Sequence, residues 1–321
     1  MMGIKVIKAG MLTTVQDLGR TGYRKDGLTV SGAMDEDALR LGNLLLGNAA
    51  GEAGLECTLT GPEILFESDA LIAITGADLS AKIDGLPAEL WRPLLLTKGS
   101  VLTFGQAIAG CRTYLSVQGG FDLSPVLGSL STYLPAGFGG FEGRALKKGD
   151  RIAFKLEVPH LPVAMNWTLS KDLYTPTDKN IIRVMKGPEF ELFGEKSLAD
   201  LFISPFSISK AADRMGYRLE GPVLQLKTAK EMLSSAVTFG TVQVTSEGSP
   251  IVLMADHQTT GGYPRILQVL RTDLGKLAQL HSGAQIQFEL LSLKQAQTLL
   301  IAREQEINQL KQSLTFKYIS S

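Results

Sequence analysis

The sequence is poor in the residues that build disulfide frameworks and metal sites. Its 321 residues include two Cys and three His. Two thiols cannot staple a chain of this length, and the histidines stand at no spacing typical of metal ligands. We therefore expect Cys57 and Cys111 to be reduced, partly buried thiols, and we expect no metal site.

An excess of charge of one sign is also absent, because 32 basic residues balance 32 acidic residues. Proteins that bind nucleic acids or anionic membrane surfaces usually carry a basic excess, so neither partner is expected. The chain also lacks an apolar run near the ~18 residues of a membrane span, and its first residues carry no signal-peptide pattern. We expect a cytoplasmic protein.

Glycine is abundant, with 34 residues, whereas charged residues make up only 20% of the chain. This composition favours a compact, β-rich protein, and the length predicts two domains. From residue 56 to 154 short apolar runs are bounded by turn residues, and Asp84-Gly85 is a pair typical of a tight hairpin. One helix is predicted to follow a cap at Ser31 or Asp35.

Two patterns occur twice along the chain, in the same order. Residues 20–27 and 214–221 share the pattern Arg-x-Gly-Tyr-Arg-x-acid-Gly, and residues 146–154 and 280–288 share Leu-x-x-Gly-x-x-Ile-x-Phe. The second pattern is typical of a turn that feeds an alternating strand. The repetition predicts two structurally similar β domains, with the Arg-containing motif as a fold element common to both.

These patterns also predict where the domains begin and end. The expected parts are a first β subdomain over 1–158, a Pro-containing linker over 159–180, a second β subdomain over 181–292, and a C-terminal part over 293–321. In the last part, Leu and Ile recur among polar residues, which predicts an amphipathic helix followed by a frayed tail from Phe316.

The most polar short stretch covers residues 256–265 and follows an apolar, strand-like run. Five consecutive polar residues precede two glycines, which let the backbone approach a ligand closely. The alternative is a polar turn whose side chains cap its own backbone. The residue types favour a ligand-binding loop.

Three further stretches are candidates, each with a plain structural alternative. Arg20 and Arg24 can bind a carboxylate or a phosphate through their guanidinium groups, but the recurrence of their motif favours a fold element. Residues 31–35 either offer backbone amides to an anion or simply cap a helix. Arg144 follows a Gly-rich stretch and either reaches a ligand or lies on an exposed hairpin.

Several common catalytic signatures are absent from the sequence. No Walker A pattern occurs, and no serine has glycines at both ±2, so a P-loop phosphate cradle and a nucleophile elbow are excluded. The sequence around Lys186 does not support a covalently attached biotin. The chemistry therefore has to come from the polar loops.

Six motifs, taken together and in order, resemble the KipA / allophanate hydrolase subunit 2 family: residues 14–22, 31–35, 119–120, 139–144, 214–218 and 259–264. The resemblance covers roughly residues 4–292. That family includes the C subunit of bacterial ATP-dependent 5-oxoprolinase and is similar to half of the carboxyltransferase domain of urea carboxylase. The resemblance implies a mainly β fold of two cyclophilin-like barrel subdomains, which agrees with the duplication.

The resemblance also implies a function. It implies a hydrolase subunit that opens 5-oxoproline to L-glutamate at the expense of ATP, with a small polar amide as substrate. It implies two protein partners, a KipI-like B subunit and, in addition, a lactam-hydrolase A subunit, with ATP shared with the partner. Two alternatives remain: a KipA-type regulatory protein that antagonises a KipI-like kinase inhibitor, and a carboxyltransferase component acting on urea or a related amide.

Such a reaction needs polar groups at the lactam oxygen and a cationic group at the substrate carboxylate. The catalytic candidates are Asp256, Gln258 and Thr260. The substrate-binding candidates, in chain order, are Arg20, Arg24, Ser31, Asp35, Arg144, His257, Thr259 and Tyr263.

Overall fold

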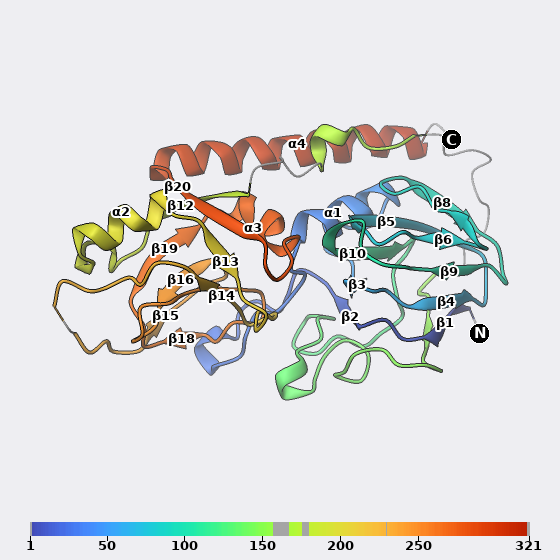
Figure 1. The fold of residues 1–321 in the computed structure, drawn as a ribbon. Coiled ribbons are helices and arrows are strands. Elements are labelled where there is room, and N and C mark those ends of the chain that lie inside the picture. Colours follow the sequence, from blue (N-terminus) through green and yellow to red (C-terminus); the bar gives the residue numbers. More distant parts are fainter. Residues whose placement is uncertain (1, 157–166, 175–179, 229, 320–321) are drawn as a thin grey trace. The chain divides into compact units, whose positions relative to one another are not determined.

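The structure is a computed structural model and describes residues 2–156, 167–174, 180–228 and 230–319. Among the regular elements β-strands predominate, as Figure 1 shows, so the predicted mainly β fold class is confirmed. It forms two compact units. Unit 1 comprises Met1–Arg20, Ser31–Thr175 and Gln305–Ser321, and unit 2 comprises Thr21–Val30 and Pro176–Glu304.

Unit 1 contains two antiparallel β-sheets. One has six strands in the order β11-β1-β4-β9-β6-β7, and the other has five in the order β2-β3-β10-β5-β8. The strands are β1 (Gly3–Lys8), β2 (Leu12–Gln16), β3 (Gly54–Thr58), β4 (Glu63–Phe66), β5 (Ala70–Asp78), β6 (Lys82–Ile83), β7 (Leu86–Pro87), β8 (Pro93–Leu96), β9 (Val101–Thr103), β10 (Ala109–Val117) and β11 (Arg151–Ala153).

The five-stranded sheet is covered on both faces, and this accounts for its continuous apolar runs. Along β5, Ile72 and Ile74 pack into the core between the two sheets. The alternate residues Leu71 and Ala73 pack instead with helix α1 (Glu36–Leu45), which lies on this sheet in Figure 1. Side chains alternate across a strand, so β5 contributes to both cores.

Local signals in the first half predict the backbone well. The side chain of Asp35 accepts a hydrogen bond from the Ala38 amide at 3.1 Å, so Asp35 is the cap of α1. The predicted hairpin joins β6 to β7, with φ of 51° at Asp84 and 84° at Gly85. Positive φ at both central residues is what a two-residue type I′ turn requires.

Both thiols are free and buried, as expected. Burial raises the pKa of Cys57 to about 12. Burial likewise raises the pKa of Cys111. Both side chains therefore remain protonated and unreactive at neutral pH.

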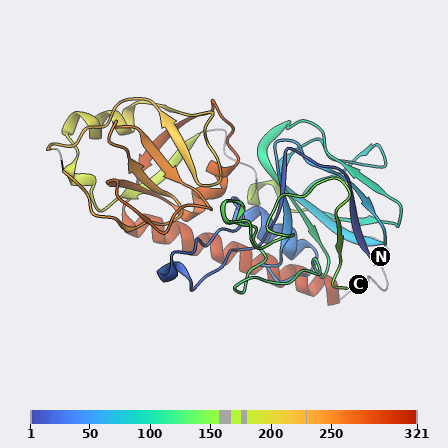
Figure 2. The same cartoon turned by 90° about the horizontal axis from the view of Figure 1, so that it is seen from below.

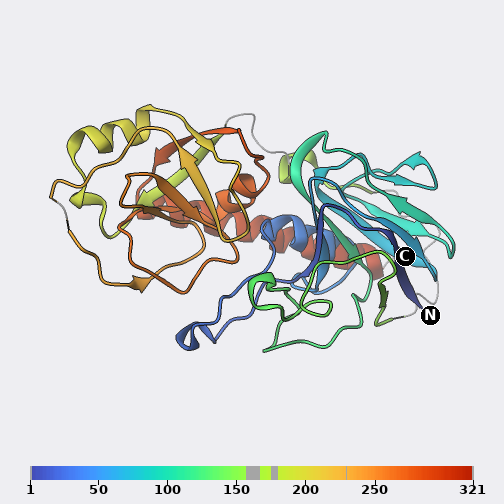
Figure 3. The same cartoon turned by 60° about the horizontal axis from the view of Figure 1, so that its bottom comes forward.

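Loops occupy most of the segment between β10 and β11, residues 118–150. They contain one 3-10 turn, η2 (Leu134–Ala136), and two isolated bridges, Val126 with Ser129 and Tyr133 with Phe138. Figure 3 shows these loops in green beside the strands of unit 1. This segment carries the Gly-rich stretch that ends at Arg144.

Unit 2 is a closed barrel with the strand order β12-β19-β16-β17-β14-β13-β20. Neighbouring strands are antiparallel except β12 and β20, which run parallel. Figure 2 shows the strands curved around the barrel, with α2 on the outside. The elements are β12 (Ile181–Lys186), α2 (Glu195–Ile203), β13 (Phe206–Ile208), β14 (Gly216–Glu220), β16 (Thr241–Val244), β17 (Pro250–Leu253), β19 (Arg265–Val269), α3 (Arg271–Ala278) and β20 (Gln285–Leu290).

A separate two-stranded ribbon belongs to unit 2 as well. It pairs β15 (Ser235–Ala236) with β18 (Thr260–Gly261). The ribbon is short and mostly exposed, but β18 lies within the polar stretch 256–265.

The turn-and-strand pattern recurs in the structure as predicted. Gly149 and Gly283 adopt positive φ of 95° and 85°, and each precedes a strand, β11 or β20. In both units, the Ile and the Phe of the pattern are buried. Glycine is needed at these two positions because other residues rarely adopt this backbone conformation.

The Arg-containing motif is not a common fold element, so that prediction is wrong. Residues 20–27 form a loop with a 3-10 turn, η1 (Arg24–Asp26), whereas residues 214–221 contain strand β14. Gly22 has φ of 98°, which an extended strand does not allow. The second copy is extended because β14 pairs with β13 and β17. Tertiary pairing therefore decides the conformation of this motif.

Most of the predicted linker lies outside the described residues. Its described part, residues 167–174, packs in unit 1, where Leu169 is 4% exposed. Tyr174 stacks on Trp91 with ring centroids 4.0 Å apart. These residues therefore contribute to a core.

The predicted C-terminal helix is confirmed as α4 (Leu293–Ile319). The prediction of a frayed tail from Phe316 is wrong, because the helix continues to Ile319. In unit 1, Ile307 and Leu314 of α4 pack with Leu44 of α1, which anchors its last turns. No helix in the described ranges combines the length and apolar character that crossing a membrane requires.

We predict that Leu115→Ala lowers the free energy of unfolding by about 2–5 kcal/mol. Leu115 on β10 is 0% exposed in the core between the sheets. The matched control is Leu86→Ala, since Leu86 on β7 is 73% exposed and its loss should change stability by no more than about 0.5 kcal/mol. Urea denaturation of both variants measures the difference, and equal effects would contradict the core assignment.

Candidate functional site

The candidate residues fall into two groups, one in each unit. Unit 2 contains Arg24, Asp256, His257, Gln258, Thr259, Thr260 and Tyr263. Unit 1 contains Arg20, Ser31, Asp35 and Arg144.

The unit 2 group is centred on a loop of residues 256–264, which we call the polar loop. It follows β17 and begins with Asp256, which is 1% exposed. The Asp256 carboxylate accepts two hydrogen bonds from Arg214, from Nε at 2.8 Å and from Nη2 at 3.1 Å. A buried, bidentate ion pair therefore anchors the start of the loop.

A second bidentate ion pair lies just beyond the end of the polar loop. Arg265 donates to Glu189 from Nε at 2.9 Å and from Nη2 at 2.7 Å. Its Nη1 also donates to the Ala236 carbonyl at 2.9 Å. The same guanidinium therefore supports the barrel strand β19 and the ribbon strand β15. Hydrogen bonds from Arg265 lower the pKa of Glu189 despite partial burial.

A buried amide lies against the middle of the polar loop. Gln243 on β16 donates to the Tyr263 carbonyl at 3.0 Å and accepts from the Gln258 side chain at 3.4 Å. A Cβ at Gly261 would lie 2.6 Å from Gln243 Nε2. Gly261 is therefore needed for the loop to approach this amide closely.

The polar loop presents its central side chains to solvent. Gln258 and Thr260 are exposed, and Tyr263 is 45% exposed. Thr259 is half-buried, and its carbonyl accepts a hydrogen bond from the Val237 amide at 3.2 Å. Anchored ends with exposed polar side chains are typical of a ligand-binding loop.

Residues Thr21–Val30, which we call the arm, bring a residue of the first half to this loop. Within unit 2, Thr29 Oγ1 donates to the His257 carbonyl at 2.7 Å, and Arg24 donates to the Val237 carbonyl. The structure thus places Arg24 and His257 near one another although 232 residues separate them along the chain. No pattern in the sequence indicated this proximity.

The His257 imidazole is held in a neutral form. Burial lowers its pKa, and the nearby Arg24 charge lowers it further, against the opposing effects of the hydrogen bond to the Gln258 carbonyl and of the Asp256 charge. Nδ1 contacts the Gln258 carbonyl, which can only accept a hydrogen bond, so Nδ1 carries the proton. Neutral His257 therefore presents Nε2 as an acceptor.

The unit 1 group is organised by Asp17, at the end of β2. Its carboxylate accepts hydrogen bonds from the Gly19 amide at 2.8 Å and the Leu130 amide at 2.6 Å. The hydroxyls of Ser129 and Ser131 donate to it as well, at 2.7 and 2.5 Å. Asp17 thereby joins the loop after β2 to residues 129–131.

Arg20 lies inside this network and is 0% exposed. Its guanidinium donates to the Ser131 carbonyl and lies over the Phe138 ring, 4.6 Å from the centroid. A Cβ at Gly139 would lie 2.1 Å from the Ser131 oxygen and 2.8 Å from Arg20 Nη2. The Gly-rich stretch therefore packs tightly around a buried arginine.

Ser31 and Asp35 lie in the same unit and are buried. The Ser31 hydroxyl donates to the Thr132 carbonyl at 3.2 Å. The Asp35 amide donates to the Tyr114 hydroxyl at 2.8 Å, and that hydroxyl donates to Glu56 at 2.7 Å. Burial, and then the Glu56 charge, raise the pKa of Tyr114 well above its usual value, so the hydroxyl stays protonated.

Arg144 is paired with acidic neighbours. It donates to Asp150 at 2.6 and 3.0 Å and also to Glu142. Burial favours a higher pKa for Asp150, but hydrogen bonds from Arg144 and from the Lys147 amide outweigh it and lower the pKa. Among the described residues, we observe no hydrogen bond between Arg144 and the other candidates of unit 1.

Sequence patterns did not single out the residues that hold these loops in place. The main ones are Gln243, Glu189, Glu56 and Tyr114. A signal was present for two of them, because Gln243 and Glu56 are isolated polar residues within apolar strands. A buried polar side chain in such a position must find a hydrogen-bond partner. Among the described residues, no cluster of three or more Cys, His, Asp and Glu is placed to hold a metal ion.

We predict that breaking one half of the Arg214–Asp256 pair destabilises unit 2 strongly. Arg214→Met should lower the free energy of unfolding by about 3–5 kcal/mol, because it leaves a buried carboxylate without its ion-pair partner. The double variant Arg214→Met with Asp256→Leu should be less destabilised than the sum of the two single variants. Urea denaturation of all four proteins completes the cycle, and strict additivity would contradict the coupling.

We predict that Glu189→Gln destabilises the protein in a pH-dependent way. The folded-state pKa of Glu189 is lowered, so its contribution is present above the usual Glu value of about 4.3 and is lost as the pH falls through the lowered pKa. Thermal unfolding at pH 7 should separate the variant from the parent, and the difference should shrink as the pH falls below the usual Glu pKa of about 4.3. Glu191→Gln is the control, since Glu191 pairs with Lys186 at the surface and should matter little.

Comparison with known proteins gives a consistent result. Residues 26–290 match the carboxyltransferase domain, subdomain A and B. The chain is 43% identical to the C subunit of 5-oxoprolinase from Escherichia coli (strain K12), over 91% of this chain and 93% of that protein. It is 38% identical to the C subunit of 5-oxoprolinase from Haemophilus influenzae, over 96% of this chain and 97% of that protein.

A solved structure is similar over nearly the whole chain. The crystal structure of the K. lactis urea amidolyase matches with a TM-score of 0.90 and 30% identity. The match covers 96% of this chain but only 20% of that much longer protein. By sequence and by fold, therefore, the chain belongs to the carboxyltransferase domain family, subdomains A and B.

Proposed function

We propose that this chain is the C subunit of an ATP-dependent 5-oxoprolinase, which opens 5-oxoproline to L-glutamate together with its A and B partners. The observation that carries the proposal is the similarity, across nearly the full length of each, to two proteins named as the C subunit of 5-oxoprolinase. The name of these relatives refers to an assembly of several subunits. We therefore expect activity only with the partners present.

The chemistry of the proposed reaction explains the need for ATP. A lactam is a planar amide, and resonance makes its carbonyl carbon a poor electrophile. Transfer of a phosphoryl group from ATP to the lactam oxygen, with ADP as the leaving group, would remove that resonance and prepare the carbon for attack by water. Cleavage of the C–N bond with protonation of the nitrogen, and loss of phosphate, would then give glutamate. The protein then has to bind the substrate carboxylate, orient the ring and stabilise charge at the lactam oxygen.

Within this proposal, the polar loop binds the lactam end of the substrate. Gln258 and Thr260 are exposed between two anchored ends, so the Thr260 hydroxyl and the second N–H of the Gln258 amide are available as hydrogen-bond donors. Asp256 is engaged by Arg214 in the buried ion pair. We therefore assign Asp256 a positioning role, in which it holds the loop instead of touching the substrate.

Two further parts of the proposal concern small molecules and partners. The sequence has no Walker A pattern, so we propose that ATP is bound together with the KipI-like B subunit. We propose no covalently attached biotin, because Lys186 lies on β12 and donates to Glu191 at 2.8 Å at the barrel surface. The proposed assembly is completed by the lactam-hydrolase A subunit.

The test is reconstitution of all three proteins and measurement of glutamate released from 5-oxoproline, with and without ATP. We predict ATP-dependent release, and we predict that Gln258→Ala or Thr260→Ala lowers kcat by roughly 10²-fold while the assembly still forms. Thr298→Ala, at an exposed position on α4, is the matched control and should retain full activity. Absence of glutamate from the complete assembly would refute the proposed function.

A carboxyltransferase component is the second candidate. It is favoured by the family match and by the similarity to the K. lactis urea amidolyase. In that case the chain would act with a biotin carrier supplied by another protein, on urea or a related amide. Carboxylation of urea by the chain with a carboxybiotin carrier, in place of glutamate release, would support this candidate.

A further inference from the structure

We propose that Arg24 and His257 together form a site for the carboxylate group of the substrate. The identity of that substrate rests on the proposed function, whereas the site itself rests on the geometry of unit 2. The arm supplies the guanidinium, and the polar loop supplies the imidazole. The neighbouring Gln258 and Thr260 would then meet the rest of the bound molecule.

Three arginines are candidates for carboxylate recognition, and the structure separates them. Arg144 already pairs with Asp150 and Glu142. Arg20 is 0% exposed and lies over Phe138 beneath Gly139. Neither guanidinium can receive a carboxylate without a rearrangement of the structure around it.

Arg24 differs from both. It is half-buried, and its observed hydrogen bond goes to a neutral carbonyl, that of Val237. In the described part of the chain, Arg24 makes no ion pair with an Asp or Glu side chain. A partly desolvated guanidinium without an anionic partner is well suited to bind one.

His257 completes the site through its second ring nitrogen. Nδ1 contacts the Gln258 carbonyl, and no described residue hydrogen-bonds to Nε2. The charged groups that face the imidazole are Arg24 from the arm and Asp256 from its own loop. Burial is the main reason that the ring stays neutral, and the Arg24 charge adds to it more than the Asp256 charge opposes it.

An anion bound between Arg24 and His257 would raise the pKa of His257. It would offset the Arg24 charge and accept a hydrogen bond from a protonated Nε2. Carboxylate binding would therefore be linked to proton uptake by His257, and affinity should increase as the pH falls. A rise of one unit in the pKa of His257 corresponds to about tenfold tighter binding to its protonated form.

The experiment is an NMR titration of the histidine ring protons in the full-length chain. His257 is one of three histidines, and His257→Gln identifies its signal. The probes are cyclopentanecarboxylate, which has the carboxylate but no lactam, and 2-pyrrolidinone, which has the lactam but no carboxylate. We expect the first to raise the pKa of His257 by about one unit and the second to leave it unchanged.

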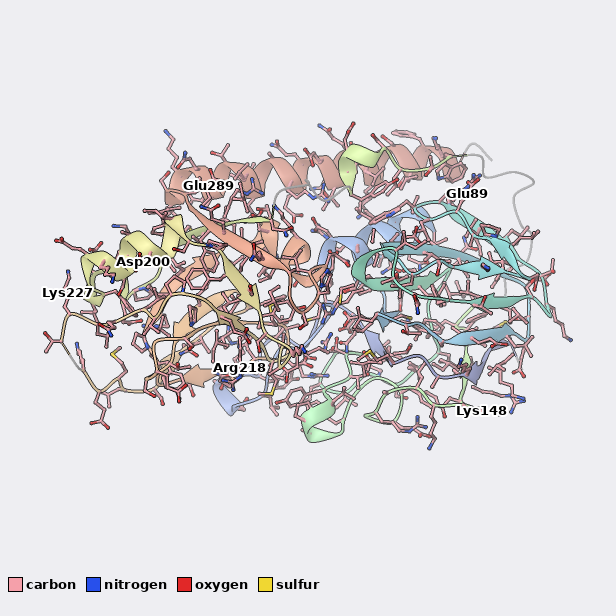
Figure 4. The ribbon with its side chains drawn as sticks, in the orientation of Figure 1. Glu89, Lys148, Asp200, Arg218, Lys227 and Glu289 are labelled. Atoms are coloured by element: carbon pink, nitrogen blue, oxygen red, sulfur yellow. The ribbon has the colours of Figure 1, made fainter. Side chains whose placement is uncertain are left out.

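Variants separate the charge of Arg24 from the position of the arm. Arg24→Gln should weaken cyclopentanecarboxylate binding by at least about tenfold and abolish the pKa rise. Thr29→Val removes the hydrogen bond from the arm to the His257 carbonyl but keeps the Arg24 charge, so the pKa rise should persist. The matched control is Arg218→Gln. Arg218 is exposed on β14, is labelled in Figure 4, and has the same place in the second copy of the motif as Arg24 has in the first.

Each outcome decides the proposal. It is overturned if the carboxylate leaves the pKa of His257 unchanged at saturation, if Arg24→Gln retains the rise, or if Thr29→Val loses it as fully as Arg24→Gln. The titration involves no turnover and no partner protein. Carboxylate binding without glutamate release by the complete assembly would therefore refute the proposed function and leave the site in place.

Discussion

Buried polar groups must keep their hydrogen bonds, and this constraint fixes the loops of both units. In unit 1, Asp17 accepts four hydrogen bonds and joins two loops that are more than a hundred residues apart in the sequence. In unit 2, the Arg214–Asp256 pair and the Gln243 amide do the same for the polar loop. Burial of these groups is favourable only while these hydrogen bonds form. They therefore allow fewer loop conformations than apolar packing alone would allow.

The same constraint divides the candidate residues into two classes. Buried ones such as Arg20 and Asp256 bond to neighbouring groups and support the structure around them. Partly exposed ones such as Arg24, Gln258 and Thr260 lie on segments whose ends are anchored. Only the partly exposed residues can contact a ligand, and the buried residues hold them in place precisely. A substitution in either class should therefore reduce activity, but only one in the first class should also unfold the protein.

Much of the fold was predictable because its signals are local. The cap at Asp35 and the turn at Asp84-Gly85 depend on backbone groups only a few residues away. The candidate site was predictable in part: the polar loop and its residues could be found from composition. The common conformation expected for residues 20–27 and 214–221 was wrong, because strand pairing within the barrel shapes one copy and not the other.

The sequence by itself determined the β-rich class, the start of helix α1, the turn glycines and the family, because each depends on residue type and short spacing. Only the tertiary structure decided which polar side chains bond to neighbouring groups and which are available to a ligand. It also brought Arg24 of the arm to His257, through hydrogen bonds between segments over 200 residues apart. Long-range contacts of this kind leave no periodic pattern in one sequence, since the partner of a buried or half-buried polar group is chosen by the folded chain.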